Sequence, residues 1–459
     1  MPRPPDLLHG PIVPTLLRLA IPNVFAMAAA TAVGIGETVY VGLLGKTALA
    51  AMALVFPFVM LMQMFSAGAM GGGASSAISR ALGGGQTARA QALAVHAVCI
   101  GVAAGFVFTA LFVVFGASLY AALGGQGAVL EEARLYGRWV FLATPAIWLF
   151  NTLISLVRGT GNMRIPSGSI LAVSLVQVAI GATLGLGLFG VPRYGMQGVA
   201  LGQVIAFYAA ASVLWWYVRH GPARLRLEFT GVRLQWALFQ DILRVGALAC
   251  LSPLLTVATV LIVTSLVAAH GNDALAGYGV GSRLEFLLVP VAFGIGVAAV
   301  PMVGMAMGAG QVARARKVAW RAGILAGLLL GAVGMLLFAW PDLWAALFTS
   351  DPGVLAQARS YLRWAGPGFG FLGLGLVMYF AAQGSGNVLA PVGAAFLRFI
   401  FVAVGGHMLV AAGAGPWALF ALVGAAMVVY GTATALGVHW SHWGPRTATP
   451  VPAGVTRPS

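Results

Sequence analysis

The sequence contains little charge. Of its 459 residues, 8% are Asp, Glu, Lys or Arg, whereas 60% are hydrophobic. A soluble domain carries charge on roughly a quarter of its residues. The shortage excludes a soluble globular protein and predicts a polytopic membrane protein that lies almost entirely in the bilayer.

Cysteine is also scarce. Cys99 and Cys250 lie in apolar stretches far apart in the sequence, so they indicate nothing about the redox compartment. No CxxC or His-rich spacing is present. We therefore expect no metal site and no cofactor.

Acidic residues number 10 against 25 Lys and Arg, which gives a formal net charge of +15. The basic residues gather in short stretches between apolar spans, which is the pattern of the positive-inside rule. No stacking platform or groove-reading motif accompanies them, so nucleic acid is not an expected partner. The residues in these stretches are Arg80, Arg89, Arg158, Arg164, Arg219, Arg224, Arg226, Arg233, Arg244, Arg314, Arg316, Lys317 and Arg321.

Sets of catalytic residues are missing as well. A membrane-embedded enzyme would need a nucleophile with its base, or paired acids or metal ligands at one depth in the bilayer. The sequence offers no such set. We therefore expect that the protein is not an enzyme.

Long apolar runs fill the chain and predict twelve transmembrane helices. The first run is too long for the apolar core of a cleavable signal peptide, so it is expected to remain as a helix. With both termini cytoplasmic, most Lys and Arg residues fall on inside segments, which favours that orientation. The expected helices span 13–43, 47–79, 88–121, 129–157, 163–189, 195–219, 240–269, 273–306, 313–346, 354–383, 388–412 and 416–440.

The longest hydrophilic segment lies at the midpoint and divides the chain. We expect an N-lobe of helices 1–6 at residues 1–219, a cytoplasmic linker at 220–244, and a C-lobe of helices 7–12 at 245–443. Residues 234–239 are expected to form an interfacial helix. The tail at 444–459, rich in Pro and Thr, is expected to be disordered.

An internal repeat supports this division. Six helices per half return the chain to its starting side, so an axis along the membrane normal would relate two lobes around a cleft, as in secondary transporters with alternating access. A duplicated bundle without transport, such as a scaffold or receptor, is the alternative. The repeated segments, displaced by 225 or 226 residues, are 83–90 with 308–315, 136–139 with 361–364, 159–162 with 384–387, and 45–50 with 271–276.

One acidic residue stands inside the first span. From residue 12 to residue 44, only Arg18 and Glu37 carry charge. A carboxylate in hydrocarbon is costly unless it faces a polar cavity, binds a cation or carries a proton, so Glu37 is a candidate functional residue. The alternative places it just past the bilayer edge, near Gly42 and Lys46.

With these features the chain resembles the multidrug and toxic compound extrusion (MATE) family of antiporters over essentially its whole length. The resemblance implies a V-shaped pair of six-helix lobes that exports organic, often cationic, compounds in exchange for H⁺ or Na⁺. The helix-8 pattern is similar to the prokaryotic DNA-damage-inducible branch, and helix 7, at 245–269, holds no carboxylate. The matching segments are 36–42, Gly45 with 48–51, Pro57, the Gly-x-Gly-Gln-x-x-x-Ala turns after helices 2 and 8, and Ser282 to Glu285.

The resemblance also implies roles for single residues. Glu37 takes the place of the helix-1 acid that protonates or binds the cation, and Pro22 that of a helix-1 proline that can hinge the helix. Asn151 matches a polar residue near that acid. In helix 5, Gln177 and Gly181 stand where many relatives carry Asn and Asp. The missing second carboxylate weakens the case for a Na⁺ site and favours a proton.

A substrate cavity is expected near Tyr40, Met27, Met64 and Glu285. Methionine adapts to varied ligands, which suits polyspecific binding, although it also fills ordinary gaps in a core. Glu285 could instead pair with another helix or lie near a helix end.

Two histidines and one arginine have simpler interpretations. His96 and His407 could carry protons at physiological pH, but a lone His in an apolar helix more often bonds to a neighbouring carbonyl. Arg398 is expected to snorkel to the cytoplasmic interface.

The sequence therefore predicts an all-α polytopic membrane protein with twelve transmembrane helices, in two pseudo-symmetric six-helix lobes around a V-shaped cleft. The predicted function is export of small organic, drug-like compounds coupled to H⁺, with Na⁺ as the second candidate ion. A lipid or polysaccharide flippase of the same wider superfamily is the rival, and a channel fits the duplication less well. We expect a monomer in the inner membrane of a prokaryote, with membrane lipids as further partners.

Overall fold

A computed structural model describes residues 6–222 and 224–443. Every regular element within these residues is helical. The tail predicted to be disordered, 444–459, lies outside the described residues.

The first half of the chain forms eight α-helices, one π-helical segment (η1) and one short 3₁₀ segment (η2) in the described residues. They are α1 (Ile12–Gly42), α2 (Lys46–Gln63), η1 (Met64–Met70), α3 (Gly71–Gly83), α4 (Thr87–Ala122), α5 (Gly127–Leu142), α6 (Thr144–Gly159), α7 (Arg164–Leu186), η2 (Leu188–Gly190) and α8 (Gly195–His220).

The second half is built in the same way, again with one 3₁₀ segment (η3). Its elements are α9 (Trp236–Ala249), α10 (Leu251–Ala268), α11 (Asn272–Gly308), α12 (Val312–Ala339), α13 (Asp342–Ala345), α14 (Pro352–Ala365), η3 (Gly366–Gly368), α15 (Phe369–Ser385), α16 (Leu389–Ala411) and α17 (Pro416–Trp440).

These helices confirm the predicted number of membrane spans. Among the described residues, eleven helical stretches are long and apolar enough to cross a bilayer, and the bent pair α5–α6 makes a twelfth. The expected boundaries lie within a few residues of the observed ones. The largest difference is at the end of α12, which stops at Ala339, before the short helix α13.

The bend between α5 and α6 has a local cause. The two helices meet at 42°, next to Pro145. Proline has no N–H, so it cannot bond to the carbonyl of Phe141 four residues earlier. The Thr109 hydroxyl on α4 donates to that carbonyl instead, at 2.7 Å. A neighbouring helix thus satisfies the backbone group that the break leaves open.

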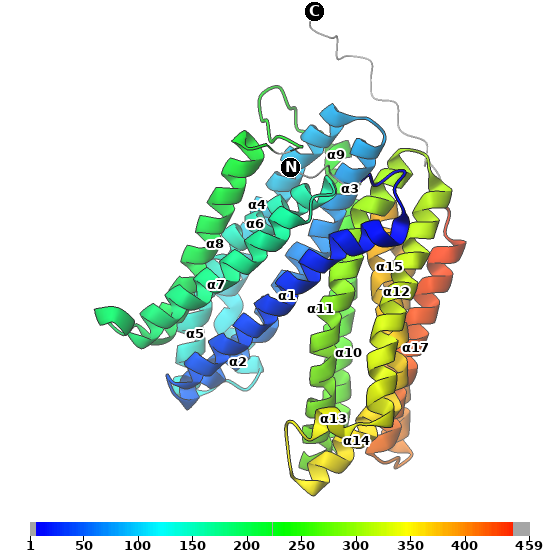
Figure 1. The fold of residues 1–459 in the computed structure, drawn as a ribbon. Coiled ribbons are helices and arrows are strands. Elements are labelled where there is room, and N and C mark those ends of the chain that lie inside the picture. Colours follow the sequence, from blue (N-terminus) through cyan, green and yellow to red (C-terminus); the bar gives the residue numbers. More distant parts are fainter. Residues whose placement is uncertain (1–5, 223, 444–459) are drawn as a thin grey trace, which may run out of the picture.

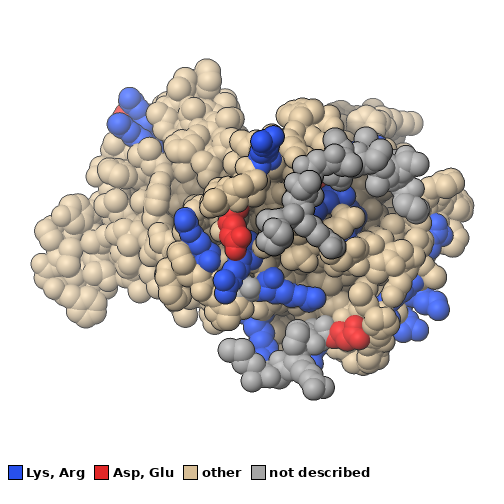
Figure 2. All heavy atoms as spheres, turned by 90° about the horizontal axis from the view of Figure 1, so that it is seen from above, with Lys and Arg blue, Asp and Glu red and all other residues tan. Residues whose placement is uncertain are grey.

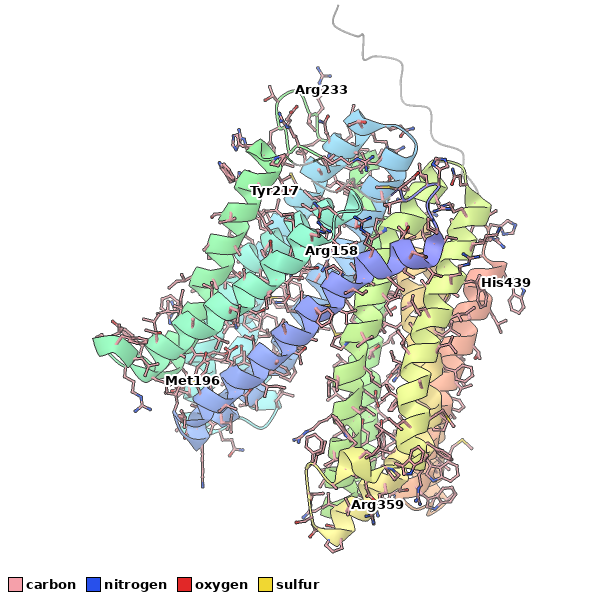
Figure 3. The ribbon with its side chains drawn as sticks, viewed as in Figure 1. Arg158, Met196, Tyr217, Arg233, Arg359 and His439 are labelled. Atoms are coloured by element: carbon pink, nitrogen blue, oxygen red, sulfur yellow. The ribbon has the colours of Figure 1, made fainter. Side chains whose placement is uncertain are left out.

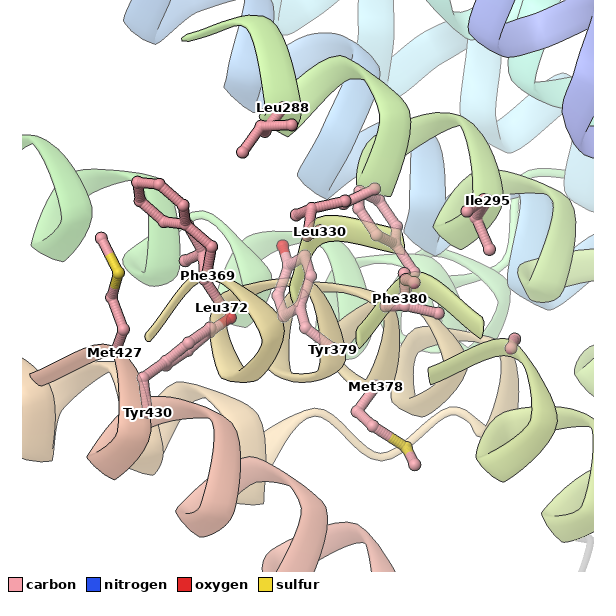
Figure 4. Packing of buried hydrophobic residues seen from close by; sticks show 14 of the residues in the cluster. Leu288, Ile295, Leu330, Phe369, Leu372, Met378, Tyr379, Phe380, Met427 and Tyr430 are labelled. Carbon is pink, nitrogen blue, oxygen red and sulfur yellow. The ribbon is translucent and has the colours of Figure 1, made fainter. Parts of the chain in front are cut away.

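Two hydrophobic cores organise the molecule. The first core consists of buried residues between Tyr40 and Ile242, and the second chiefly of buried residues between Ala249 and Trp443. Figure 4 shows the second core, where α15 packs against α11, α12 and α17. In Figure 1 the helices of the two cores form two groups that meet at one end and diverge at the other. The two-lobe architecture is confirmed, and the boundaries at 219 and 244 remain a proposal.

Each core also receives the first turns of a helix from the other half of the chain. α1 runs diagonally between the two groups (Figure 1), and Ile12, Leu16 and Leu19 at its start are buried in the second core. Conversely, α9 packs against α3 and α4, and its Ile242 belongs to the first core. We call this arrangement the segment exchange.

Equivalent arginines hold the two exchanged segments. Asp241 on α9 pairs with Arg80 of α3 at 2.7 Å and with Arg89 of α4 at 3.0 Å. Arg314 on α12 donates to the backbone carbonyls of Leu7, at 3.1 Å, and of Gly10, at 2.6 Å, just before α1. Arg89 and Arg314 occupy the same position of the internal repeat. Each half therefore fixes the opening segment of the other half with the same residue.

The exchange lies at the end where α1 begins and α17 ends, which we call the terminal face (Figure 1). α3 and α11 pack so closely there that a Cβ on Gly304 would collide with the Ser79 side chain. Figure 2 looks onto this face and shows Lys and Arg side chains over both groups of helices, with few acidic ones. Arg233 lies at this end, and Arg359 lies at the opposite end (Figure 3).

Candidate functional site

Glu37 lies in the last two turns of α1, where α1 packs against α7. Its side chain is buried, with 7% of the residue exposed. The Gln177 amide on α7 donates a hydrogen bond to Glu37 Oε2 at 2.9 Å. The alternative of a solvated acid beyond the bilayer edge does not fit this burial. The structure therefore brings together two of the residues that were predicted for coupling.

Tyr40 lies one turn after Glu37 on the same face of α1. It is buried, and its hydroxyl has no hydrogen-bond partner among the described residues. The hydroxyl lies against Gly181 on α7: a Cβ at that glycine would be 2.6 Å from Tyr40 Oη. The absence of a side chain at Gly181 thus makes room for the Tyr40 hydroxyl.

Tyr136 on α5 is a third member of this cluster, and the sequence analysis did not select it. Its side chain is buried and lies within electrostatic range of Glu37 and Tyr40. The internal repeat could have identified Tyr136, because it matches Tyr361 in the second half of the chain. The candidate site therefore comprises one carboxyl group, one amide and two tyrosines from three helices.

Asn151 on α6 is oriented elsewhere. Its Nδ2 donates to Gln63 Oε1 at 3.0 Å and to Ser66 Oγ at 2.8 Å. These bonds tie α6 to the junction of α2 and η1, and no hydrogen bond joins Asn151 to Glu37 among the described residues. A π-helical segment leaves its backbone less regular than an α-helix and is often found at functional sites. In this structure Asn151 supports that segment.

Pro22 lies inside α1, which remains helical on both sides of it. The next residue, Asn23, is fully buried and accepts a hydrogen bond from Arg158 Nη2 on α6 at 3.1 Å. Placing Arg158 between two apolar spans was wrong, because it belongs to α6 (Figure 3) and is buried, with 3% of the residue exposed. Arg158 thus holds α1 next to the expected hinge.

Glu285 on α11 pairs with another helix, since it accepts a hydrogen bond from the Tyr361 hydroxyl on α14. The Arg398 guanidinium is close enough to interact with it electrostatically. The expectation that Arg398 snorkels to the interface was wrong: the residue is buried, and its Cζ lies 5.7 Å from the ring centre of Tyr430.

Met27 and Met64 are half-buried, and neither of the two cavities found among the described residues includes them or Glu37. His96 and His407 bond to carbonyl groups one turn back, as the simpler interpretation predicted. His96 Nε2 also accepts the N–H of Gln235 at 2.9 Å. Within the described residues, no three His, Cys, Asp or Glu side chains converge as metal ligands would.

The MatE family model matches residues 22–183 and again residues 249–409, once in each half of the internal repeat. The chain belongs to the MatE family. It is thus a multi-pass membrane transporter and not an enzyme. Its assignment to one branch of the family remains a prediction.

Relatives in the MatE family are distant but extend over most of the chain. The probable multidrug resistance protein NorM of Thermotoga maritima is 25% identical over 82% of this chain and 81% of its own length. The FAD transporter of Shewanella oneidensis is 25% identical over 81% of this chain and 82% of its own length. A solved MATE structure in the bent conformation is 22% identical, covers 95% of each chain and has a TM-score of 0.86, which shows the shared fold.

Proposed function

We propose that this MatE protein exports small organic, often cationic, compounds in exchange for protons. The names of its relatives, a probable multidrug resistance protein and an FAD transporter, support transport of organic molecules. The coupling proposal is carried by one observation: Glu37 is buried and is bound by the neutral amide of Gln177. In the described residues no Lys or Arg forms a salt bridge with it.

The choice of H⁺ over Na⁺ rests on the number of carboxylates. A hard metal cation takes several oxygen atoms around it, carboxylates above all. The cluster offers one carboxylate, at Glu37, beside neutral amide and hydroxyl oxygens, while Gly181 contributes no side chain. A proton needs only the carboxylate. The Glu37 carboxyl group can alternate between a neutral and a charged form as its surroundings change.

In the proposed cycle, a proton that enters from the face opposite the terminal face neutralises Glu37. The neutral side chain no longer retains water or a cationic substrate, so α1 can bend near Pro22, narrow the proposed N-lobe cavity and expel the substrate. Bending there must break or move the Arg158–Asn23 hydrogen bond. Release of the proton toward the terminal face then resets the carboxylate.

The proposed orientation places the terminal face in the cytoplasm. The predominance of Lys and Arg on that face supports it, because cytoplasmic segments carry an excess of these residues. Both ends of the described chain lie at this face (Figure 1).

Efflux of ethidium from proteoliposomes tests the proposal. A pH gradient alone is expected to drive efflux, and Glu37→Gln is expected to abolish it while the protein folds. The matched control is Glu131→Gln, an exposed acid on α5 that should keep full activity. Efflux that a Na⁺ gradient drives in the absence of a pH gradient would overturn proton coupling. Full efflux by Glu37→Gln would remove Glu37 from the mechanism.

A further inference from the structure

A cavity of about 360 Å³ opens on the terminal face, where the start of α1 meets the first turns of α12. Its wall contains no Asp or Glu. It consists of residues just before and at the start of α1 and of three basic residues from α12: His9, Gly10, Pro11, Ile12, Arg314, Lys317 and Arg321.

The three basic residues share one face of α12, because they are spaced by three and four positions. Arg314 is half-buried and donates to the carbonyl groups of Leu7 and Gly10. Lys317 and Arg321 are exposed, and neither pairs with a carboxylate among the described residues. Two of the three charges are therefore available to a ligand, and the third holds the wall in place.

The wall opposite α12, formed by the residues just before α1, is held in a turn by hydrogen bonds. The Asp6 carboxylate accepts hydrogen bonds from the N–H groups of Leu8 and His9, both at 3.0 Å. The backbone N–H of His9 is the main cause that lowers the pKa of Asp6, so this turn favours the charged carboxylate. Leu7 is buried in the second core. Asp6 is not among the residues that line the cavity, and its other carboxylate oxygen lies 3.3 Å from Nδ1 of His9, which does line it.

A concave surface lined by unpaired cations attracts an anion, and Lys and Arg are the residues that recognise phosphate. Basic pockets between transmembrane helices on the cytoplasmic side bind phospholipid head groups. The positive end of the α1 dipole adds to the field of the α12 cations.

We propose that this cavity binds a phosphate group, with Lys317 and Arg321 as its ligands. Two sources fit this chemistry: the head group of an anionic phospholipid, or a soluble phosphate compound. The lipid source rests on the cytoplasmic orientation proposed above. Binding of a lipid at this place would attach the start of α1 to α12.

Native mass spectrometry of the purified full chain tests the lipid source. Phosphatidylglycerol is expected to remain bound at higher occupancy than phosphatidylcholine, and Lys317→Gln/Arg321→Gln is expected to weaken its binding roughly ten-fold or more, because two charge-assisted contacts are lost. The control variant Arg219→Gln/Arg233→Gln removes the same charge elsewhere and should bind like the wild type. The readout requires no transport, so it is independent of the coupling mechanism.

Inorganic phosphate, added to lipid-depleted protein in detergent, tests the soluble source. A rise in the thermal midpoint that the Lys317→Gln/Arg321→Gln variant lacks supports the phosphate site with a soluble ligand. Equal phosphatidylglycerol binding by the wild type and this variant, together with no effect of phosphate, would overturn the proposal.

Cross-linking keeps the proposal testable without any variant. A photoactivatable phosphatidylglycerol, with the reactive group on its head group, should label peptides that contain residues 9–12 or 314–321 of the wild-type protein. Labelling confined to other peptides would contradict the site.

Discussion

The Gln177 amide donates the side-chain hydrogen bond that Glu37 receives in the described structure. We expect Gln177→Leu to lower efflux under a pH gradient by roughly ten-fold, since a hydrogen bond to a charged group contributes about 1.5–3 kcal/mol. Gln177→Asn, one methylene shorter, should retain part of the activity. Rates in proteoliposomes at matched protein content provide the measurement. An unchanged rate in Gln177→Leu would show that coupling does not use this bond.

The contact between Tyr40 and Gly181 makes a second prediction. Gly181→Ala places a Cβ 2.6 Å from Tyr40 Oη, which is too close, so the ring must shift. We expect a loss of roughly 1–3 kcal/mol in stability, as for other overpacked sites. The double variant Gly181→Ala/Tyr40→Phe should recover most of it, because the hydroxyl is gone.

Thermal unfolding in detergent measures this pair of variants. Gly168→Ala is the matched control, because it lies on the same helix with open space around its Cβ position. A Gly181→Ala protein as stable as Gly168→Ala would mean that Tyr40 moves aside at no cost.

Sequence and resemblance could select Glu37 and Gln177, which the structure joins by a hydrogen bond, whereas the role of Pro22 as a hinge stays a prediction. They could not predict that Arg158 is buried, because an arginine at the end of an apolar run looks like a loop residue. Its position follows from Asn23 on α1, a contact across 135 positions. The sequence analysis also missed Tyr136, because its neighbours Glu37 and Tyr40 lie on another helix.

At the scale of elements, the break between α5 and α6 depends on Thr109. Thr109→Val removes the side-chain donor of the Phe141 carbonyl, and we expect a loss of about 1–3 kcal/mol in stability. Thr109→Ser should restore it. Thr183→Val serves as the control, because the Thr183 hydroxyl bonds only to a carbonyl one turn back in its own helix. Equal midpoints for Thr109→Val and Thr183→Val would contradict this role.

Helix positions were predictable to within a few residues because apolar length sets them. α9 is the informative exception. Its hydrophilic beginning indicated an interfacial helix at 234–239, whereas the observed helix starts at Trp236 and leads into the membrane span. The charged Asp241 occurs near the start of α9 because it forms ion pairs with Arg80 on α3 and Arg89 on α4.

At the scale of the whole molecule, the glycines of α3 and α11 permit closure at the terminal face. Gly304→Leu inserts a side chain against Ser79, so we expect it to open this face and lower efflux. In a background without Cys99 and Cys250, the variant Ser75→Cys reports opening through faster maleimide labelling, because Ser75 is buried. Gly393→Leu, with open space at its Cβ, is the control. Equal labelling rates would refute this closure.

The segment exchange was not predictable from the sequence. Hydropathy places each helix across the membrane but does not say which neighbours its ends will meet. The internal repeat indicated two equivalent halves but not which segments they exchange. The contacts of Arg314 with residues before α1 join positions up to 307 residues apart, and no local pattern reports such a distance.

The segment exchange also has a consequence for biosynthesis. A ribosome releases the start of α1 long before α11 and α12, the helices against which it packs, have been made. Its apolar side chains, Ile12, Leu16 and Leu19 among them, must wait in the translocation machinery or in lipid until the second half is inserted. Because chains fold from the N-terminal side as they emerge, the first turns of α1 are made early and seated late. Truncated translation products would therefore expose that helix to membrane quality control.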